Sequence, residues 1–255
     1  MDTNQRSPQK NFCCTNCRKT TSNLYRKYNA TVLKLTECEK CKAVADKYVE
    51  YDIVIILIDL ILLNTKAYRH ILLNTDFKNF WKLLVIIILT ESYCNWSLKS
   101  RQDGTLCCKE NNTEPSLHEF DMNLEDLRFY VICLNSVFSY FFFVFLIYAL
   151  TVVFNKYFST TKLKEVTFVT VVKTMTLSST GIFLQLPSII WDISLYNYHL
   201  HFITLYTSLS QLLAYRAIFD SPKIWCLFVI FSSHLLRFTV IENIGAVWES
   251  IFVMI

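Results

Sequence analysis

The chain has 255 residues, of which 53% are hydrophobic and 15% aromatic, and its formal net charge is +4. A positive mean hydropathy of +0.32 at this length is typical of a polytopic membrane protein and argues against an ordinary soluble domain. With only three glycines, the chain also lacks a glycine-rich phosphate-binding loop. The first residues are polar and have no apolar core, so they predict no signal peptide, and we expect the N-terminus in the cytosol.

A basic, cysteine-rich segment occupies residues 1–52, with ten Lys or Arg against six Asp or Glu. Two Cys-x2-Cys pairs, Cys14 with Cys17 and Cys38 with Cys41, are separated by twenty residues, which is typical of a four-cysteine zinc site. Each tight turn presents two thiolates, and four sulfurs enclose one tetrahedral ion. Because four cysteines leave no open coordination position, we expect a structural Zn²⁺ ion in a small zinc-ribbon-like module.

Two points about this module stay open in the sequence. Residues 30–35 (Ala-Thr-Val-Leu-Lys-Leu) have the composition of a strand, as the hairpin of a zinc ribbon would. Cys13 directly precedes Cys14, so Cys13-x3-Cys17 is also an allowed first ligand pair. Disulfides are the alternative to a metal, and the expected cytosolic location disfavours them.

An apolar segment follows at residues 53–63, and Asp59 is its one charged residue. A helix of this length reaches about 16 Å, well short of the ~30 Å hydrocarbon core of a bilayer. Lys66 follows Asp59 by seven residues and His70 follows by four more, which predicts one polar stripe along a helix. We expect residues 53–76 to form a helical segment in the membrane interface, with these three side chains as functional candidates. A buried helix of a soluble core is the alternative.

Residues 77–255 have the pattern of a multi-pass transmembrane region with about five spans. The predicted spans are 80–96, 129–154, 166–186, 202–219 and 224–241. Residues 91–126 carry eight acidic and three basic residues and predict a luminal loop, whereas a lysine-bearing connector lies on the cytosolic side. This loop holds sequons at Asn95 and Asn111 and three cysteines (Cys94, Cys107 and Cys108), for which disulfides and free thiols are both open. The predicted fold is therefore a mainly α-helical polytopic membrane protein with an N-terminal four-cysteine zinc-ribbon-like module.

Charged side chains inside the predicted spans are further functional candidates. Lys173 lies about two turns into its span, where an ammonium group is costly unless it is paired or hydrated. Snorkelling towards the cytosolic face is the alternative explanation. His234 and Arg237, three residues apart on one helix face, carry a weaker version of the same argument.

The order of these motifs resembles the Arv family, whose name stands for ACAT-related protein required for viability. The resemblance rests on the two Cys-x2-Cys pairs followed by VADKYVEYD, IDLILL and AYRH, and it continues at residues 173–179 and 186–191. Arg18 departs from the family pattern, which usually has glycine after the second cysteine. The resemblance implies an endoplasmic-reticulum membrane protein of sterol and sphingolipid homeostasis, with a link to delivery of glycosylphosphatidylinositol (GPI)-anchor intermediates.

No enzyme motif stands out in the sequence. His70 and Asp76 are one residue further apart than the His-x4-Asp pair of lipid acyltransferases, and no Ser-His-Asp grouping is evident. We therefore expect a non-enzymatic protein that moves or positions sterols and other lipids. Its expected partners are membrane lipids, sterols and the GPI-anchor or lipid-synthesis machinery, with no nucleic acid. A membrane-embedded lipid-modifying enzyme and a zinc-module scaffold for lipid-synthesis complexes are the alternatives.

Overall fold

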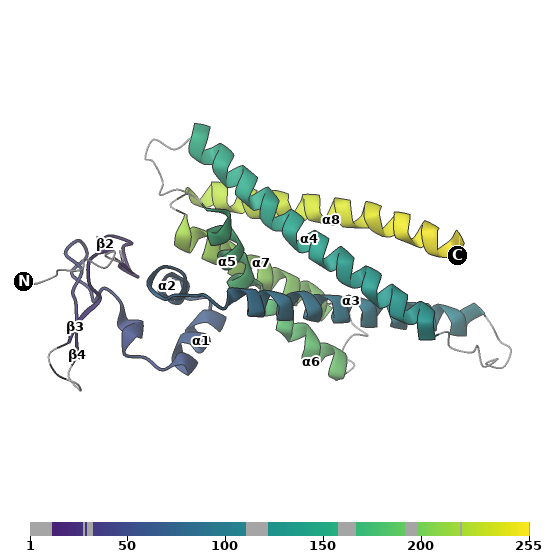
Figure 1. Cartoon of the computed structure of the whole chain (residues 1–255), viewed down its shortest axis with the longest axis horizontal. Coiled ribbons are helices and arrows are strands. Elements are labelled where there is room, and N and C mark those ends of the chain that lie inside the picture. Colours follow the sequence, from purple (N-terminus) through teal and green to yellow (C-terminus); the bar gives the residue numbers. More distant parts are fainter. Residues whose placement is uncertain are drawn as a thin grey trace, which may run out of the picture. The chain divides into compact units, whose positions relative to one another are not determined.

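The structure is a computed structural model, and the chain divides into two compact units (Figure 1). The first unit comprises Met1–Lys78 and Leu213–Asp220, and the second comprises Asn79–Leu212 and Ser221–Ile255. The described residues are 12–27, 29, 33–110, 122–157, 167–191, 198–219 and 221–254, and in 101–110, 122–126, 241–242 and 244–254 only the backbone is described.

The first unit begins with two short antiparallel strand pairs. Strand β1 (Phe12–Cys13) pairs with β2 (Thr20–Thr21), and β3 (Tyr25–Lys27) pairs with β4 (Leu33–Leu35). Strand β4 lies within the predicted strand region 30–35, of which residues 30–32 lie outside the described part. Ladders of two or three residue pairs are too short to be stable in water alone. The module therefore depends on contacts other than its sheets.

Helix α1 (Ile53–Ile61) ends earlier than the sequence pattern predicts, in a turn that contains Leu63. The backbone of Leu63 is left-handed, with φ of 60°. Its N–H group donates to the carbonyl oxygen of Leu60 at 3.0 Å, and the N–H group of Asn64 donates to that of Asp59 at 2.9 Å. These two bonds form a Schellman motif, which satisfies carbonyl groups at a helix end.

A new helix, α2 (Thr65–Arg69), begins directly after this turn, because the Asn64 side chain accepts a hydrogen bond from the N–H group of Lys66. Helix α2 continues into the π-helical turn η2 (His70–Asn74), whose end residues are both buried. The single polar stripe expected through Asp59, Lys66 and His70 is therefore wrong. The chain changes direction between the first of these residues and the other two.

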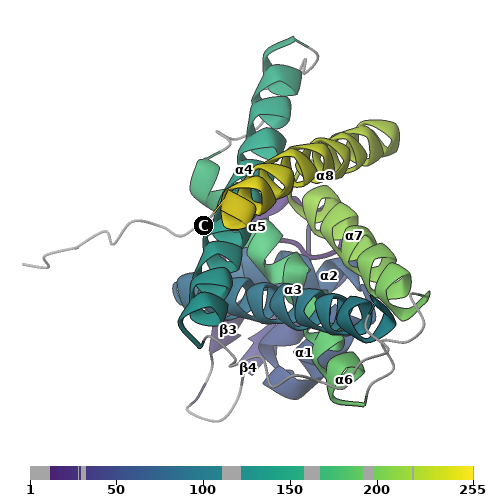
Figure 2. The same ribbon diagram turned by 90° about the vertical axis from the view of Figure 1, so that its right-hand side faces the viewer.

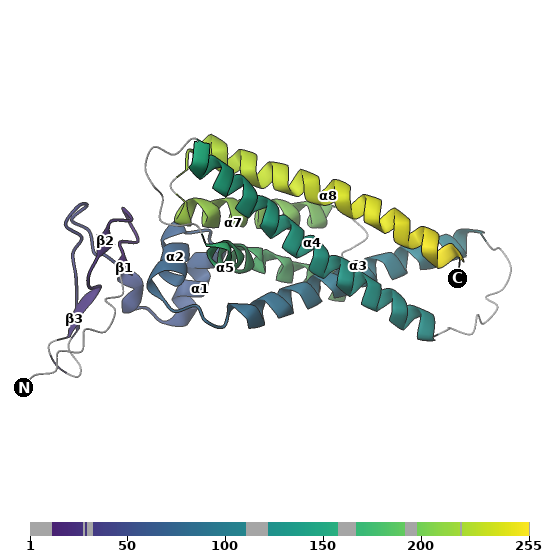
Figure 3. The same cartoon turned by 45° about the horizontal axis from the view of Figure 1, so that its top comes forward.

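The second unit is helical, with the short 3₁₀ segment η3 (Ser179–Leu184) joining α5 and α6. Helices α3, α4 and α5 contact one another pairwise, and α4 also packs against α8 (Figures 2 and 3). Fully buried side chains at the centre of this unit include Ile87, Phe143, Ile147 and Met175. Its helices are α3 (Phe80–Glu110), α4 (Met122–Tyr157), α5 (Phe168–Ser178), α6 (Gln185–Ile190), α8 (Lys223–Met254) and the part of α7 (Tyr198–Ile218) that precedes Leu213.

Two helical stretches in the described part of the chain are long and apolar enough to cross a bilayer, Leu127–Tyr157 and Lys223–Val240. The loop predicted over 91–126 is wrong in its first part, because α3 continues to Glu110 and so contains Cys94 and Asn95. Glu, Ser, Lys and Arg are compatible with a helix, so a change to polar composition does not by itself end one. Residues 111–121, with the second sequon, lie outside the described residues.

The span predicted over 166–186 is interrupted within its range, because α5 gives way to η3 at Ser179. Pro187 lies in the first turn of α6, where its missing N–H group is not needed by the helix. Gly181 explains why η3 lies so close to α7. A Cβ atom at this position would lie 2.7 Å from Thr207 Oγ1 and 2.9 Å from Tyr206 Cδ1.

Candidate metal centre and the buried carboxylate beside it

Four cysteine thiols converge in the first unit, from Cys14, Cys17, Cys38 and Cys41. All four sulfur atoms lie within 4.8 Å of one another, with 3.8 Å between Cys14 and Cys41 and 3.4 Å between Cys17 and Cys38. A tetrahedral ion with Zn–S bonds of ~2.3 Å requires sulfur atoms about 3.8 Å apart. A disulfide would need about 2.05 Å. The donor set and its spacing therefore fit one tetrahedral zinc ion.

The two cysteine turns have the same backbone geometry. The N–H group of Arg18 donates to the carbonyl oxygen of Cys14 at 2.9 Å, and that of Lys42 donates to the carbonyl oxygen of Cys38 at 2.8 Å. Each donor follows the second cysteine of its pair and is left-handed, with φ of 62° for Arg18 and 58° for Lys42. Glycine adopts this conformation without steric cost. The departure at Arg18 is thus accommodated by the same turn that Lys42 makes in the second pair.

The Arg18 side chain has a partner elsewhere in the first unit. Its Nη1 group donates to the carbonyl oxygens of Arg216 at 3.2 Å and Ala217 at 3.4 Å. These carbonyl groups belong to the last turn of α7, where helix carbonyls lack intrahelical donors and attract a cation. Arg18 therefore stabilises the position of segment 213–220 within this unit.

The protonation of the thiols differs between the two turns. Hydrogen bonds from the backbone N–H group of Ala43 and then from the Asn16 side chain lower the pKa of Cys41 to about 6. Backbone N–H groups, first that of Cys41 and then that of Lys40, also lower the pKa of Cys38. Burial raises the pKa of Cys14 to about 12. Because zinc binds thiolates, metal binding and deprotonation of Cys14 must occur together.

Cys13, the alternative first ligand, lies outside this cluster. Its thiol donates to the carbonyl oxygen of Arg18 at 3.1 Å. Its backbone is held by Asn74, because the N–H group of Cys13 donates to Asn74 Oδ1 at 2.8 Å and the Asn74 amide donates back to the carbonyl oxygen of Cys13 at 2.9 Å. The structure thus directs the Cys14 thiol into the cluster and the Cys13 thiol away from it.

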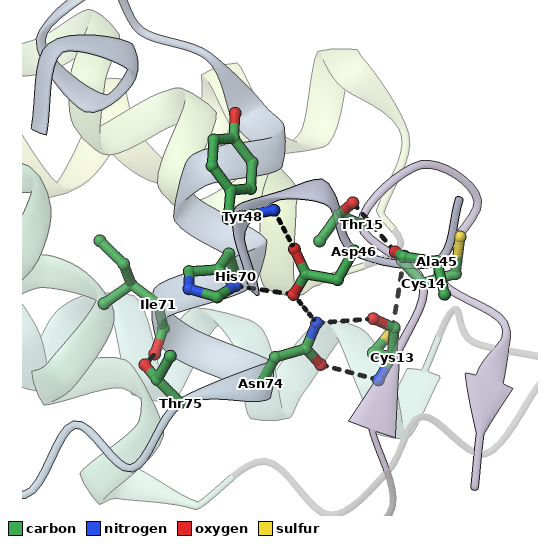
Figure 4. Close-up of polar contacts among 10 residues, drawn as sticks. All are labelled: Cys13, Cys14, Thr15, Ala45, Asp46, Tyr48, His70, Ile71, Asn74 and Thr75. Carbon is green, nitrogen blue, oxygen red and sulfur yellow. Dashed lines mark hydrogen bonds and ion pairs between the residues drawn. The ribbon is translucent and has the colours of Figure 1, made fainter. Parts of the chain in front are cut away.

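A buried carboxylate, Asp46, connects the metal module to η2 (Figure 4). Its side chain is fully buried and accepts three hydrogen bonds. Oδ1 accepts from the N–H group of Tyr48 at 3.0 Å, and Oδ2 accepts from His70 Nδ1 at 2.7 Å and from Asn74 Nδ2 at 2.6 Å. Because Asn74 also pairs with the backbone of Cys13, these groups form one network, which we call the Asp46 clamp (Asp46, His70, Asn74 and the Cys13 backbone).

Asp59 faces the interior of the first unit. Its Oδ2 atom accepts from the hydroxyl of Tyr48 at 2.6 Å and from the Asn64 amide at 3.3 Å, and it lies 3.6 Å from Lys47 Nζ. Burial, and then the nearby Asp59, raise the pKa of Tyr48. Lys66, the remaining candidate on this segment, has an exposed side chain, and its backbone N–H group donates to Asn64 Oδ1 at 3.2 Å.

The outer face of α1 is apolar and exposed. Ile53 is 75% exposed and Leu62 is 71% exposed, and further exposed side chains follow along the helix: Val54, Ile55, Leu57, Ile58 and Ile61. A helix on the surface of a soluble protein shows the reverse pattern, with polar side chains outward. A contiguous apolar face of this kind marks a surface that contacts another apolar phase.

Lys173, the candidate in the second unit, lies on α5 and is partly buried. Its Nζ atom lies 5.3 Å from the centre of the Phe80 ring, a cation–π contact. The structure therefore brings Lys173 to an aromatic ring of α3.

Three residues of the first unit that take part in these contacts were not predicted from the sequence: Asp46, Asn74 and Arg69. Arg69 donates to the carbonyl oxygens of Thr15 and Asn16 at 2.9 Å each.

Comparison with known proteins assigns this architecture to a family. The Arv1-like family model matches residues 13–215. Protein ARV1 of Homo sapiens is 35% identical over 181 residues (71% of this chain and 62% of the relative), and Protein ARV1 of Mus musculus is 31% identical over 230 residues (90% and 82%). Protein ARV 2 of Arabidopsis thaliana is 38% identical over 99 residues, which is 36% of this chain and 43% of the relative. No solved structure gives a significant match. The matched part is about three fifths of the human relative's length. On the family-model match and these relatives, the chain belongs to the Arv1-like family.

Proposed function

We propose that this protein mediates intracellular sterol and sphingolipid homeostasis by moving or positioning lipids at the endoplasmic-reticulum membrane. Family membership supports a general part in sterol and lipid homeostasis. In this proposal the zinc module is cytosolic and holds one structural Zn²⁺ ion, the second unit crosses the membrane about five times, and delivery of GPI-anchor intermediates is one use of the activity.

The exposed apolar face of α1 is the observation that carries this proposal. Residue Asp59, the one charged group of the helix, is bound to Tyr48 inside the protein, so the outward face contains no charge. Burial of apolar surface is favourable by roughly 25 cal/mol per Å², and exposing seven large aliphatic side chains to water would forgo that gain. A lipid surface would bury this apolar face and recover that free energy. The Asp46 clamp joins the metal module to the segment that follows it.

A second candidate function is a lipid-modifying enzyme within the membrane. It is favoured by one observation, that Glu91 and His234 line the same pocket of the second unit. A carboxylate and an imidazole are the usual groups for general acid–base catalysis. The two functions differ in one measurable respect, because an enzyme consumes lipid and a transporter conserves it.

Reconstitution in liposomes tests the proposal. The purified full-length protein is assayed for sterol transfer between labelled vesicles, and the lipid composition is measured before and after. The variant Ile58→Asn places an amide on the outer face of α1 and should reduce transfer at least fivefold, whereas Glu50→Gln, at an exposed residue outside that face, should not. Transfer that is unchanged by Ile58→Asn would contradict the role of α1, and consumption of a lipid would favour the enzyme.

Cysteine labelling in sealed microsomes tests the proposed orientation. A membrane-impermeant reagent should label Cys13 from the cytosolic side, because this thiol is only partly buried and lies outside the metal cluster. Cys107 should be protected until the membrane is opened. Labelling of Cys107 in sealed microsomes would invert the topology.

A further inference from the structure

The second unit contains a polar pocket of about 160 Å³, whereas the metal centre and the Asp46 clamp belong to the first unit. Helices α3, α4, α7 and α8 and the η3–α6 segment contribute to it. Its polar lining residues are Glu91, Tyr140, Ser179, Gln185, Thr204, Thr207, Gln211, His234 and Arg237, and its apolar ones are Ile87, Phe143, Ile182 and Ile203. We call this site the polar pocket.

An ion pair forms one wall of the polar pocket. Arg237 Nη2 donates to Glu91 Oε1, and Arg237 Nε donates to Ser139 Oγ at 2.6 Å. The two side chains are largely buried, 19% exposed for Arg237 and 16% for Glu91. Removing both charges from water is costly, and a buried pair is weak evidence for stability in its own right. The pair therefore calls for a functional explanation.

A chain of hydrogen bonds links three further lining residues of the polar pocket, His234, Gln211 and Ser179. His234 Nε2 lies 2.7 Å from Gln211 Oε1, and the Gln211 amide donates to Ser179 Oγ at 3.1 Å. The acceptor role of Gln211 Oε1 in this chain requires that His234 Nε2 carry a proton. These bonds orient His234 and Gln211 towards each other.

The ion pair retains hydrogen-bonding capacity. A guanidinium group has five N–H donors, and the contacts to Glu91 and Ser139 use two of them. The Glu91 carboxylate has a second oxygen atom beside the one that accepts from Arg237. The pocket thus offers positively charged N–H donors at Arg237 and, next to them, a negatively charged acceptor oxygen at Glu91.

The charge and the size of the polar pocket limit what it can hold. The charges of Glu91 and Arg237 balance. A simple anion that binds Arg237 would be repelled by Glu91 beside it, and a simple cation that binds Glu91 would be repelled by Arg237. A zwitterion avoids this repulsion, because it can lie antiparallel to the ion pair. Pockets for drug-sized ligands have volumes of roughly 300–1,000 Å³, so a pocket of about 160 Å³ suits a headgroup and not a whole lipid. The face of Phe143 is already covered by Arg237, at 5.8 Å, and the ring also contacts His234. A quaternary ammonium group, which prefers a free aromatic face, is therefore disfavoured against a primary one.

We propose that the polar pocket binds the phosphoethanolamine headgroup of a phospholipid, with the ammonium group at Glu91 and the phosphate at Arg237. Thr204 and Thr207 of α7, exposed and partly exposed, form the side from which the headgroup enters, and the acyl chains remain outside the pocket. This inference rests on the proposed lipid function and names a lipid class that the second unit recognises.

Native mass spectrometry of the detergent-purified full-length protein tests the inference. The probes are dioctanoyl-phosphatidylethanolamine, dioctanoyl-phosphatidylglycerol and dioctanoylglycerol, which share their acyl chains and differ in the headgroup. We expect the ethanolamine lipid to be retained at least tenfold better than the other two. Arg237→Gln and Glu91→Gln should each abolish this preference, whereas Lys156→Gln, which removes an exposed charge at the end of α4, should keep it.

A second variant guards against misfolding of the ion-pair variants. Thr204→Phe leaves both charges in place and adds a bulky ring at an exposed position beside the pocket, so it should reduce retention at least tenfold with an unchanged thermal unfolding midpoint. Equal retention of the three probes, or a preference for phosphatidylglycerol, would overturn the inference. Sterol transfer between vesicles that contain no ethanolamine lipid is measured in parallel, and its persistence in that case would show that the proposed function stands without this headgroup site.

Discussion

Asp46→Ala is the change that most directly tests how the metal module is joined to the segment after it. The substitution removes the acceptor of three hydrogen bonds and leaves the side chains of His70 and Asn74 without it in a buried site. Each buried donor left without a partner costs ~1–3 kcal/mol, and three donors lose the Asp46 acceptor. We therefore expect the first unit to lose about 3–5 kcal/mol of local stability.

Hydrogen–deuterium exchange of the purified full-length protein measures this loss. A decrease of 3–5 kcal/mol, at about 1.4 kcal/mol per tenfold, corresponds to exchange faster by roughly two to three and a half orders of magnitude. The faster exchange should be confined to β1 and the residues of α2 and η2, with helix α4 unchanged. Zinc content should be retained, because Asp46 does not belong to the thiol cluster.

Glu50→Gln is the matched control, since it removes a carboxylate four residues further on that is exposed to solvent. Exchange in this variant should be within about threefold of the wild type, as is usual for surface substitutions. If Asp46→Ala also stayed within threefold, the clamp would contribute little, and the network would be a consequence of the fold and not a cause of its stability.

Five further substitutions follow from the geometry. Cys38→Ser should abolish the content of about one zinc per chain, measured by elemental analysis, whereas Cys13→Ser should keep it. Asp59→Leu removes the acceptor of a buried tyrosine hydroxyl and should destabilise the first unit by ~1–3 kcal/mol and impair sterol distribution in cells, with zinc content retained. Leu63→Gly should raise the thermal unfolding midpoint, because glycine relieves a left-handed backbone at a gain of up to ~1 kcal/mol. Gly181→Ala should lower the free energy of unfolding by ~1–3 kcal/mol and so lower the midpoint, because the new methyl group would lie 2.7 Å from Thr207 Oγ1 of α7.

Each of these has an outcome that contradicts it. Normal zinc content in Cys38→Ser would refute the ligand set, and full rescue of a sterol-handling defect by Asp59→Leu would reduce α1 to an apolar connector. A gain from Leu63→Ala as large as that from Leu63→Gly would show that backbone strain is not the cause. An unchanged midpoint in Gly181→Ala would mean that α7 moves freely away from η3.

The cysteine spacing by itself determined which thiols could meet. Two Cys-x2-Cys pairs separated by twenty residues predict a four-sulfur cluster, because a two-residue spacing brings both thiols of a turn to the same side. The choice between Cys13 and Cys14 was beyond the sequence, since both spacings are sterically allowed. Tertiary structure decided it, because Asn74, 61 residues away, holds the backbone of Cys13 and so directs the next thiol inward.

The apolar composition of residues 53–63 likewise predicted a helix. The structure contains that helix, but composition alone did not predict where it ends or which way Asp59 faces. Hydrophobic periodicity reports the existence of a helix better than its end, and a leucine in a left-handed turn carries no sequence signal that distinguishes it from a helical leucine. Only the fold reveals that Asp59 faces Tyr48, because the position of the partner depends on η1 (Lys47–Val49), whose helical turn follows the metal module.

Of the features described above, the polar pocket is the one that the sequence alone predicts least. Arg237 was singled out as a charge in an apolar helix, on the physical ground that such a charge needs a partner. Its partner Glu91 is 146 residues away in a stretch whose polar composition predicted a loop. Local patterns encode helices and ligand spacings because those depend on neighbours in the chain, whereas partners across a helix bundle are set by packing, which no local pattern contains.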